Sequence, residues 1–141
     1  MRGFIDLTVD DAMKRPATTL SPDATVGELE DLFERYDYNS FPVVEHDRLF
    51  GIVTKFDFLR NFIFTADSIL PHYDDLMRGH VAEIMRRQVA TVDPDMALTR
   101  VLQMMVDMST KSFPVVSDGK VVGIISREDV IRALRRAVGR G

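Results

Sequence analysis

Cysteine is absent from this sequence, so the chain has neither a disulfide framework nor a thiolate metal site. No apolar run approaches the roughly 20 residues that a membrane-spanning helix needs, and the first residues lack the apolar core of a signal peptide. No long polar tract indicates disorder. These absences favour a soluble intracellular protein that has no contact with a membrane, and we expect it to be cytoplasmic.

An excess of positive charge is also missing, since the formal net charge is −4. That balance argues against general nucleic-acid binding. The C-terminal segment is nevertheless basic, with Arg132, Arg135, Arg136 and Arg140. Oligonucleotide binding through this segment stays an alternative, although cations at the end of a helix are the simpler interpretation. Any anionic ligand must be held by local basic groups and backbone amides.

The most informative feature that is present is an internal repeat. Ser40-Phe-Pro-Val-Val44 is followed after six residues by Gly51-Ile-Val-Thr-Lys-Phe-Asp57, and both recur 72 residues later, as Ser112-Phe-Pro-Val-Val116 and Gly123-Ile-Ile-Ser-Arg-Glu-Asp129. Residues 9–62 and 81–134 share 15 identities over 54 ungapped positions. Two copies are too few for a solenoid. We therefore expect an α/β protein of two β-α-β-β-α repeats packed as a pseudo-twofold pair, with repeat 1 at 8–64, a connector at 65–79 and repeat 2 at 80–138.

The sequence predicts the same order of secondary-structure elements in both repeats. A short capped helix at 8–13, with a counterpart at 80–85, precedes an extended segment rich in β-branched residues. Ser21-Pro22-Asp23 and Asp93-Pro94-Asp95 predict the starts of two amphipathic helices. Strands at 41–44 and 49–54 predict a hairpin, and in the second copy Asp118-Gly119 favours a tight turn. A final helix is expected at 56–64 and again at 128–138.

Thr54-x-x-Asp57 and Ser126-x-x-Asp129, at the ends of predicted strands, allow two interpretations. A hydroxyl followed three residues later by an acid is typical of a helix capping box. The same hydroxyl, with free amides at a helix start, would also suit a phosphate, and the acid could accept both hydroxyls of a ribose. Lys55 and Arg127 would add positive charge. The two interpretations are compatible, since a capping residue can also contact a ligand.

The doubled pattern resembles the cystathionine-β-synthase (CBS) domain, and residues 8 to about 136 look like a tandem pair of such domains, often called a Bateman module. The resemblance implies a regulatory, energy-sensing module rather than an enzyme. Its ligands would be adenosine-containing compounds such as AMP, ADP, ATP, S-adenosylmethionine, NAD or diadenosine polyphosphates, with no cofactor required. The acid would take the ribose hydroxyls, the hydroxyl residue would take phosphate or ribose oxygens, and backbone near the opposite first strand would read adenine.

Carried onto this chain, the resemblance implies two ligand clefts that each combine residues of both repeats. The first cleft would consist of Ile52, Thr54, Lys55 and Asp57 with Val89, Ala90, Thr91, Lys111, Ser112 and Pro114. The second would consist of Ile124, Ser126, Arg127 and Asp129 with Ala17, Thr18, Thr19, Asn39, Ser40 and Pro42. Because Lys111 in the first corresponds to Asn39 in the second, we expect the first cleft to favour extra phosphates. With no effector domain in the sequence, the expected target is another, unidentified protein.

An enzyme is the first alternative, and the histidines argue against it. His46, His72 and His80 show neither a catalytic triad arrangement nor metal-ligand spacing. His72 with Asp74 and Asp75 could hold a metal loosely, although a solvated connector is the simpler interpretation. We therefore expect no catalytic residues and no metal site.

A ligand-free dimerisation scaffold is the second alternative. The last helix of each repeat is more apolar than one small sheet can cover, through Phe58, Leu59, Phe62, Ile63, Phe64, Val130, Ile131 and Leu134. An apolar patch of this size is usually an interface. We therefore expect a homodimer, and dimerisation does not exclude ligand binding.

Overall fold

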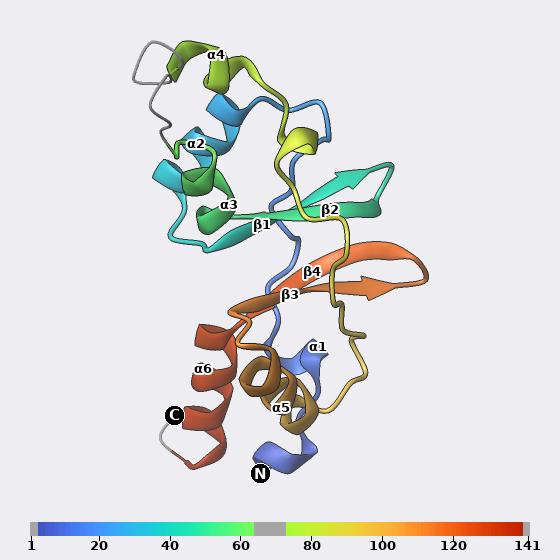
Figure 1. Cartoon of the computed structure of the whole chain (residues 1–141). Helices are drawn as coiled ribbons and strands as arrows, with labels where there is room; N and C mark the ends of the chain where they lie inside the picture. Colours follow the sequence, from blue (N-terminus) through green and yellow to red (C-terminus); the bar gives the residue numbers. More distant parts are fainter. Residues whose placement is uncertain (1–2, 64–72, 140–141) are drawn as a thin grey trace. The chain divides into compact units, whose positions relative to one another are not determined.

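The structure is a computed structural model that describes residues 3–63 and 73–139 (Figure 1). Its elements in chain order are η1 (Phe4–Asp6), α1 (Val9–Ala12), α2 (Val26–Arg35), β1 (Ser40–Glu45), β2 (Arg48–Thr54), α3 (Lys55–Arg60), α4 (Tyr73–Arg78), η3 (Val81–Glu83), α5 (Leu98–Met108), β3 (Ser112–Ser117), β4 (Lys120–Ser126) and α6 (Arg127–Ala137). The chain forms two compact units. We call Thr18–Val89 the central unit, and Met1–Ala17 with Ala90–Gly141 the terminal unit.

Each unit contains one antiparallel hairpin, as predicted: β1 with β2 in the central unit, and β3 with β4 in the terminal unit. The turn between β3 and β4 places Asp118 at φ 53° and Gly119 at φ 77°. Two successive residues with positive φ match the twist of a tight hairpin, and Asp-Gly adopts that conformation at little cost. The turn of the other hairpin has the same form, with His46 at φ 52° and Asp47 at φ 66°.

A segment from the other repeat adds to one edge of each hairpin. Lys14, which precedes repeat 1's extended segment, pairs in the terminal unit with Ile124 of β4, through backbone hydrogen bonds of 2.9 and 3.1 Å. Arg86, which occupies the same place in repeat 2, pairs in the central unit with Ile52 of β2, at 2.9 and 2.8 Å. The two repeats therefore exchange their leading segments.

The glycine that opens each Gly-x-x-Thr/Ser motif makes this exchange possible. A Cβ atom added at Gly123 would lie 2.4 Å from the carbonyl oxygen of Lys14, and one added at Gly51 would lie 2.5 Å from that of Arg86. Both distances are far inside van der Waals contact. Only glycine lets the incoming backbone lie directly against the strand.

Each unit has its own hydrophobic core. The central core forms under α2 and the β1–β2 hairpin, from Leu20, Ala24, Leu29, Phe41, Val43, Val53 and Val81. The terminal core forms under α5, α6 and the β3–β4 hairpin, from Val9, Val92, Leu98, Val101, Met105, Phe113, Val115, Ile125, Val130 and Ala133. These cores fix the positions of the strand ends from which the candidate site is built.

The predicted starts of the two long helices are wrong. Ser21 and Asp93 instead form turns, in which their side-chain oxygens accept hydrogen bonds from the backbone N–H two residues later, at 3.1 and 3.0 Å. Helix α2 begins at Val26 behind Thr25, which forms a capping box with Glu28. Helix α5 begins at the equivalent place, Leu98, without a side-chain cap. Leu98, the first residue of α5, is fully buried.

Three smaller features differ from the predicted elements. The expected helix at 80–85 is the shorter 3-10 helix η3. Helix α4 lies in the predicted connector, whereas residues 64–72, which include Phe64 at the end of repeat 1 and His72 in the connector, are outside the described residues. On α5, Leu102 and Met108 follow the helical spacing of apolar residues that predicts a buried face, but both are exposed. Among residues 3–63 and 73–139, no helix combines the length and apolar character needed to cross a membrane.

Candidate functional site

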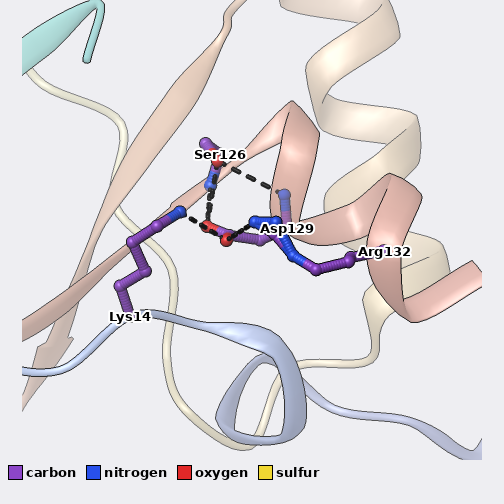
Figure 2. A network of polar contacts seen from close by, with 4 residues as sticks. All are labelled: Lys14, Ser126, Asp129 and Arg132. Atoms are coloured by element: carbon purple, nitrogen blue, oxygen red, sulfur yellow. Dashed lines mark hydrogen bonds and ion pairs between the residues drawn. The ribbon is translucent and has the colours of Figure 1, made fainter. Parts of the chain in front are cut away.

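In the terminal unit, the predicted acid Asp129 lies at the junction of β4 and α6 and receives four hydrogen bonds (Figure 2). Its Oδ2 accepts from the backbone N–H of Ser126 at 2.8 Å and from the Ser126 hydroxyl at 2.9 Å. Its Oδ1 accepts from Lys14 Nζ at 2.5 Å and from the Arg132 guanidinium at 3.1 Å. Lys14 and Arg132 approach the carboxylate from two sides. We call this group the Asp129 corner.

In the central unit, Asp57 occupies the equivalent junction of β2 and α3. Its Oδ2 accepts from the backbone N–H of Thr54 at 3.0 Å. Its Oδ1 accepts from Arg86 Nε at 2.9 Å and from the Arg60 guanidinium at 3.3 Å. We call this group the Asp57 corner. The two corners therefore have the same plan, with Lys14 replaced by Arg86 and Arg132 by Arg60.

The capping-box interpretation is confirmed in both corners. The N–H of Asp57 donates to the Thr54 hydroxyl at 3.0 Å, and the N–H of Asp129 donates to that of Ser126 at 3.3 Å. Each acid therefore holds its own helix start, and each is fixed in place by it. This does not decide the ligand-binding interpretation, because only Oδ2 of each acid is used by the box.

The corners combine buried acids with partly exposed cations. The side chains of Asp57 and Asp129 are 0% and 3% exposed, whereas those of Arg86 and Lys14 are 51% and 35% exposed. A buried carboxylate is stable only with charged or hydrogen-bonding partners. Within the described residues, every buried side-chain nitrogen or oxygen has such a partner. The carboxylates are therefore rigid, while the groups that cover Oδ1 have a path to solvent.

The terminal unit brings together ten of the predicted binding residues, and the central unit the other ten. In the terminal unit, Ser112 pairs with Ser126, Pro114 with Ile124, and the N–H of Arg127 donates to the Lys111 carbonyl at 3.0 Å. This unit also contains Asp129, Ala17, Ala90 and Thr91.

The central unit repeats these contacts. Ser40 pairs with Thr54, Pro42 with Ile52, and the N–H of Lys55 donates to the Asn39 carbonyl at 2.9 Å. Asp57, Thr18, Thr19 and Val89 belong to the same unit. Lys111 therefore lies beside Arg127 and Asn39 beside Lys55. The combination of residues from both units into one cleft stays a prediction.

The side chain of Arg127 has a hydrogen-bond partner other than Asp129. Its Nε donates to the carbonyl oxygen of Thr110 at 3.2 Å, beyond the end of α5. There it lines a hollow of about 220 Å³ together with apolar side chains of α5 and α6. The positive charge beside the acid comes from Lys14 and Arg132 instead.

Lys14, Arg86, Arg60 and Arg132 are the residues that sequence reasoning missed as partners of the acids. The sequence did contain a signal for these residues, because a cation recurs at the repeat offset of 72 residues. This holds for Lys14 and Arg86, and for Arg60 and Arg132. Arg60 and Arg132 also follow their acids by three residues, which places them on the same helical face. Nothing in the sequence indicated that Lys14 meets an acid 115 residues away.

The other candidate residues that the structure describes lie apart from the two corners. Asp74 and Asp75 lie in the first turn of α4, and His46 lies in a hairpin turn. In the part of the chain that the structure describes, no group of three or more His, Asp or Glu residues could hold a metal ion.

Comparison with known protein families explains why the corner occurs twice in this chain. The family model of the CBS domain matches the chain twice, at residues 9–63 and 81–136. The chain belongs to the CBS domain family. The predicted α/β fold of two CBS repeats is thereby confirmed, and the two corners are equivalent positions of two CBS domains.

Solved CBS structures and curated relatives agree with this assignment. The AcuB protein of Vibrio cholerae is 26% identical with a TM-score of 0.81, over 94% of this chain and 93% of that one. The CBS domain pair of protein MJ0100, in complex with 5′-methylthioadenosine and S-adenosyl-L-methionine, is 26% identical with a TM-score of 0.73, over 89% and 94%. Protein MJ1232 of Methanocaldococcus jannaschii is 28% identical over 130 residues, which are 92% of this chain. The chain spans 40% of that relative's length.

Proposed function

We propose that this CBS pair is a regulatory module that binds an adenosine-containing ligand and signals its presence to a partner protein, without catalysis. The candidates are AMP, ADP and ATP, with S-adenosylmethionine and NAD as further possibilities. The related MJ0100 domain pair, crystallised with two adenosyl compounds, supports this ligand class. In this chain, one observation carries the proposal: each unit presents a rigid, buried carboxylate beside a hydroxyl at the end of a strand.

The geometry of the corners suits the two hydroxyls of a ribose. The capping box holds Oδ2 of Asp57 and of Asp129, so the carboxylate plane is fixed before a ligand arrives. Oδ1 is covered by side chains that are partly exposed to solvent. If a ribose hydroxyl replaced one of these donors, the buried Oδ1 would accept the same number of hydrogen bonds as before. Preorganised acceptors of this kind reduce the ordering cost of binding.

Signalling requires the ligand to bind one arrangement of the protein better than another. The exchanged segments offer a route for such coupling. Lys14, which contacts Asp129, lies three residues before Ala17, where the chain passes from the terminal to the central unit. Arg86, which contacts Asp57, lies three residues before Val89, where the chain passes back. A ligand that displaced either cation would act on the chain next to these crossings.

The proposal is tested first by native mass spectrometry of the freshly purified protein, and then by a thermal-shift panel of adenine nucleotides and S-adenosylmethionine. A ligand present at about 100 times its dissociation constant should stabilise the fold by about 2.7 kcal/mol. The absence of any bound adenosyl compound and of any shift across the panel would contradict the proposal.

Variants of the acids test the site itself. Asp57→Ala or Asp129→Ala should weaken binding at one site each, but alanine also opens the capping box. Asp57→Asn and Asp129→Asn keep a capping oxygen and remove the charge, so the double Asn variant should lose about tenfold or more in affinity. Asp11→Asn is the matched control, because Asp11 closes a similar box with Thr8 on α1. Full affinity in the double variant would refute these roles.

A ligand-free dimerisation scaffold is the second candidate, and an exposed apolar face supports it. Val106 and Ile131 are 67% and 55% exposed. They line the hollow of about 220 Å³ between α5 and α6, with Leu102, Met105, Val130 and Arg127. Such a face fits the proposed homodimer. A dimer by light scattering, combined with no thermal shift for any adenine compound, would favour the scaffold over the sensor.

A further inference from the structure

We propose that Lys14 and Arg86 make each site selective for an anionic nucleotide. In the free protein each is the counter-ion of the buried acid. When a ribose takes its place on the acid, the cation pairs with a phosphate of the same ligand. This inference rests on the proposed function and adds the chemical class: a nucleoside phosphate rather than a neutral nucleoside or a cationic S-adenosyl compound.

The number of donors on Asp129 shows that a ribose must displace something. A carboxylate has about four acceptor positions, and Asp129 already accepts four hydrogen bonds, two from Ser126, one from Lys14 and one from Arg132. Asp57 accepts three, from Thr54, Arg86 and Arg60. Two ribose hydroxyls therefore need two donors to leave Asp129, and one to leave Asp57.

The donors that can leave are the cations on Oδ1. The bonds from Ser126 and Thr54 belong to the helix cap and include backbone N–H groups, so breaking them would open the helix start. Lys14 and Arg86 come from separate segments of the chain, and their side chains are already 35% and 51% exposed. Arg132, the second donor that must leave Asp129, is 45% exposed. Each of these cations can move into solvent without leaving a buried, unpaired cation.

Charge decides which ligand makes this exchange favourable. Each acid has two cations on Oδ1, so the corner carries excess positive charge although the whole chain has a formal net charge of −4. A ribose replaces a charge-assisted bond with a neutral one, which is weaker. A phosphate on the same ligand restores a charge-assisted bond to the displaced Lys14 or Arg86. A neutral nucleoside cannot do so, and a cationic ligand adds repulsion.

The repeat provides an independent check on this reading. Lys14 and Arg86 differ in side chain and lie 72 residues apart, yet both reach Oδ1 of the equivalent acid from an exchanged segment. Arg15 and Arg87 follow them in the sequence at the same offset. Arg15 pairs with the surface acid Asp10 instead of Asp129. The chain therefore contains a matched pair of cations next to the proposed pair.

Isothermal titration of the full chain with AMP, adenosine and S-adenosylmethionine tests the proposal. The wild-type protein should bind AMP about 10- to 100-fold more tightly than adenosine. The double variant Lys14→Gln with Arg86→Gln keeps an N–H donor for each acid but removes both charges. In this variant the preference for AMP over adenosine should fall about tenfold or more. The affinity for AMP should decrease, while the affinity for adenosine should stay the same or increase. S-adenosylmethionine should bind more weakly than adenosine to the wild type and regain affinity in this variant.

The control is Arg15→Gln with Arg87→Gln, which changes the net charge equally and should keep the wild-type preference. The double variant Lys14→Arg with Arg86→Lys keeps both positive charges, so it should retain the wild-type preference for AMP. An unchanged preference in the Lys14 and Arg86 Gln variant, or equal loss for AMP and adenosine, would overturn the inference, because either result indicates a purely structural role. Equal wild-type affinity for the two compounds would overturn it while the proposed function stands. No binding of any of the three compounds would overturn the inference, and the proposed function would fall with it if ADP, ATP and NAD also gave no thermal shift.

Discussion

The glycines that lie against the exchanged segments make the structure testable without any ligand. In Gly123→Ala, the new Cβ would lie 2.4 Å from the carbonyl oxygen of Lys14 and 3.3 Å from Sδ of Met13. In Gly51→Ala it would lie 2.5 Å from the carbonyl oxygen of Arg86 and 2.8 Å from Sδ of Met85. The nearest atom in each case is backbone, which cannot rotate away. The exchanged segment must therefore move off the strand.

The magnitude follows from the bonds that this movement opens. Lys14 and Ile124 exchange two backbone hydrogen bonds, of 2.9 and 3.1 Å, and two such bonds contribute a net total of about 1–3 kcal/mol. Strain and lost packing of an overfilled site add about 1–3 kcal/mol. Alanine offsets about 0.4–1 kcal/mol by restricting the unfolded chain. We expect Gly123→Ala to lower the free energy of unfolding by about 1–5 kcal/mol, and Gly51→Ala by a similar amount.

Urea unfolding followed by far-UV circular dichroism measures this change. Gly27→Ala is the matched control, because its added Cβ would meet nothing closer than the Met77 carbonyl oxygen at 3.4 Å. Gly27 lies inside α2, so that substitution should raise stability by about 0.5–1 kcal/mol. If the free energies of unfolding of Gly51→Ala and Gly123→Ala both lie within about 0.5 kcal/mol of the wild-type value, the exchanged segments do not pack against these strands as described.

Three further predictions concern the helix starts, the core and the exposed apolar face. Ala97→Ser should stabilise the uncapped helix α5 by about 0.5–1 kcal/mol, and Thr25→Ala should cost α2 about 1 kcal/mol; urea midpoints that move in the opposite directions would exclude the assigned helix starts. Phe41→Ala, at a fully buried position of the central core, should cost about 3–5 kcal/mol, and a loss below about 1 kcal/mol in the same assay would show that this core is not packed as described. Val106→Glu with Ile131→Glu should reduce self-association measured by light scattering at increasing concentration, since both side chains are exposed and apolar; an unchanged molar mass would exclude this face as the interface.

Local structure was largely predictable from the sequence because its causes lie a few residues apart. Asp118-Gly119 sets a hairpin turn, and Ser126 with Asp129 closes a capping box, in any surroundings. The start of α2 was mispredicted because Ser21 caps a turn instead of a helix. The helix begins four residues after the predicted position, where Val26 and Leu29 are buried and Thr25 provides the cap.

The sequence alone thus determined that two similar α/β repeats exist, which family they belong to, and that each contains a hydroxyl and an acid at a helix start. Only the tertiary structure decided that each repeat's leading segment packs in the other unit, and that Lys14 and Arg86 therefore cover Asp129 and Asp57. The physical reason is the similarity of the repeats. Equivalent segments have nearly the same apolar pattern, so the pattern fits either hairpin, and only three-dimensional packing selects between them.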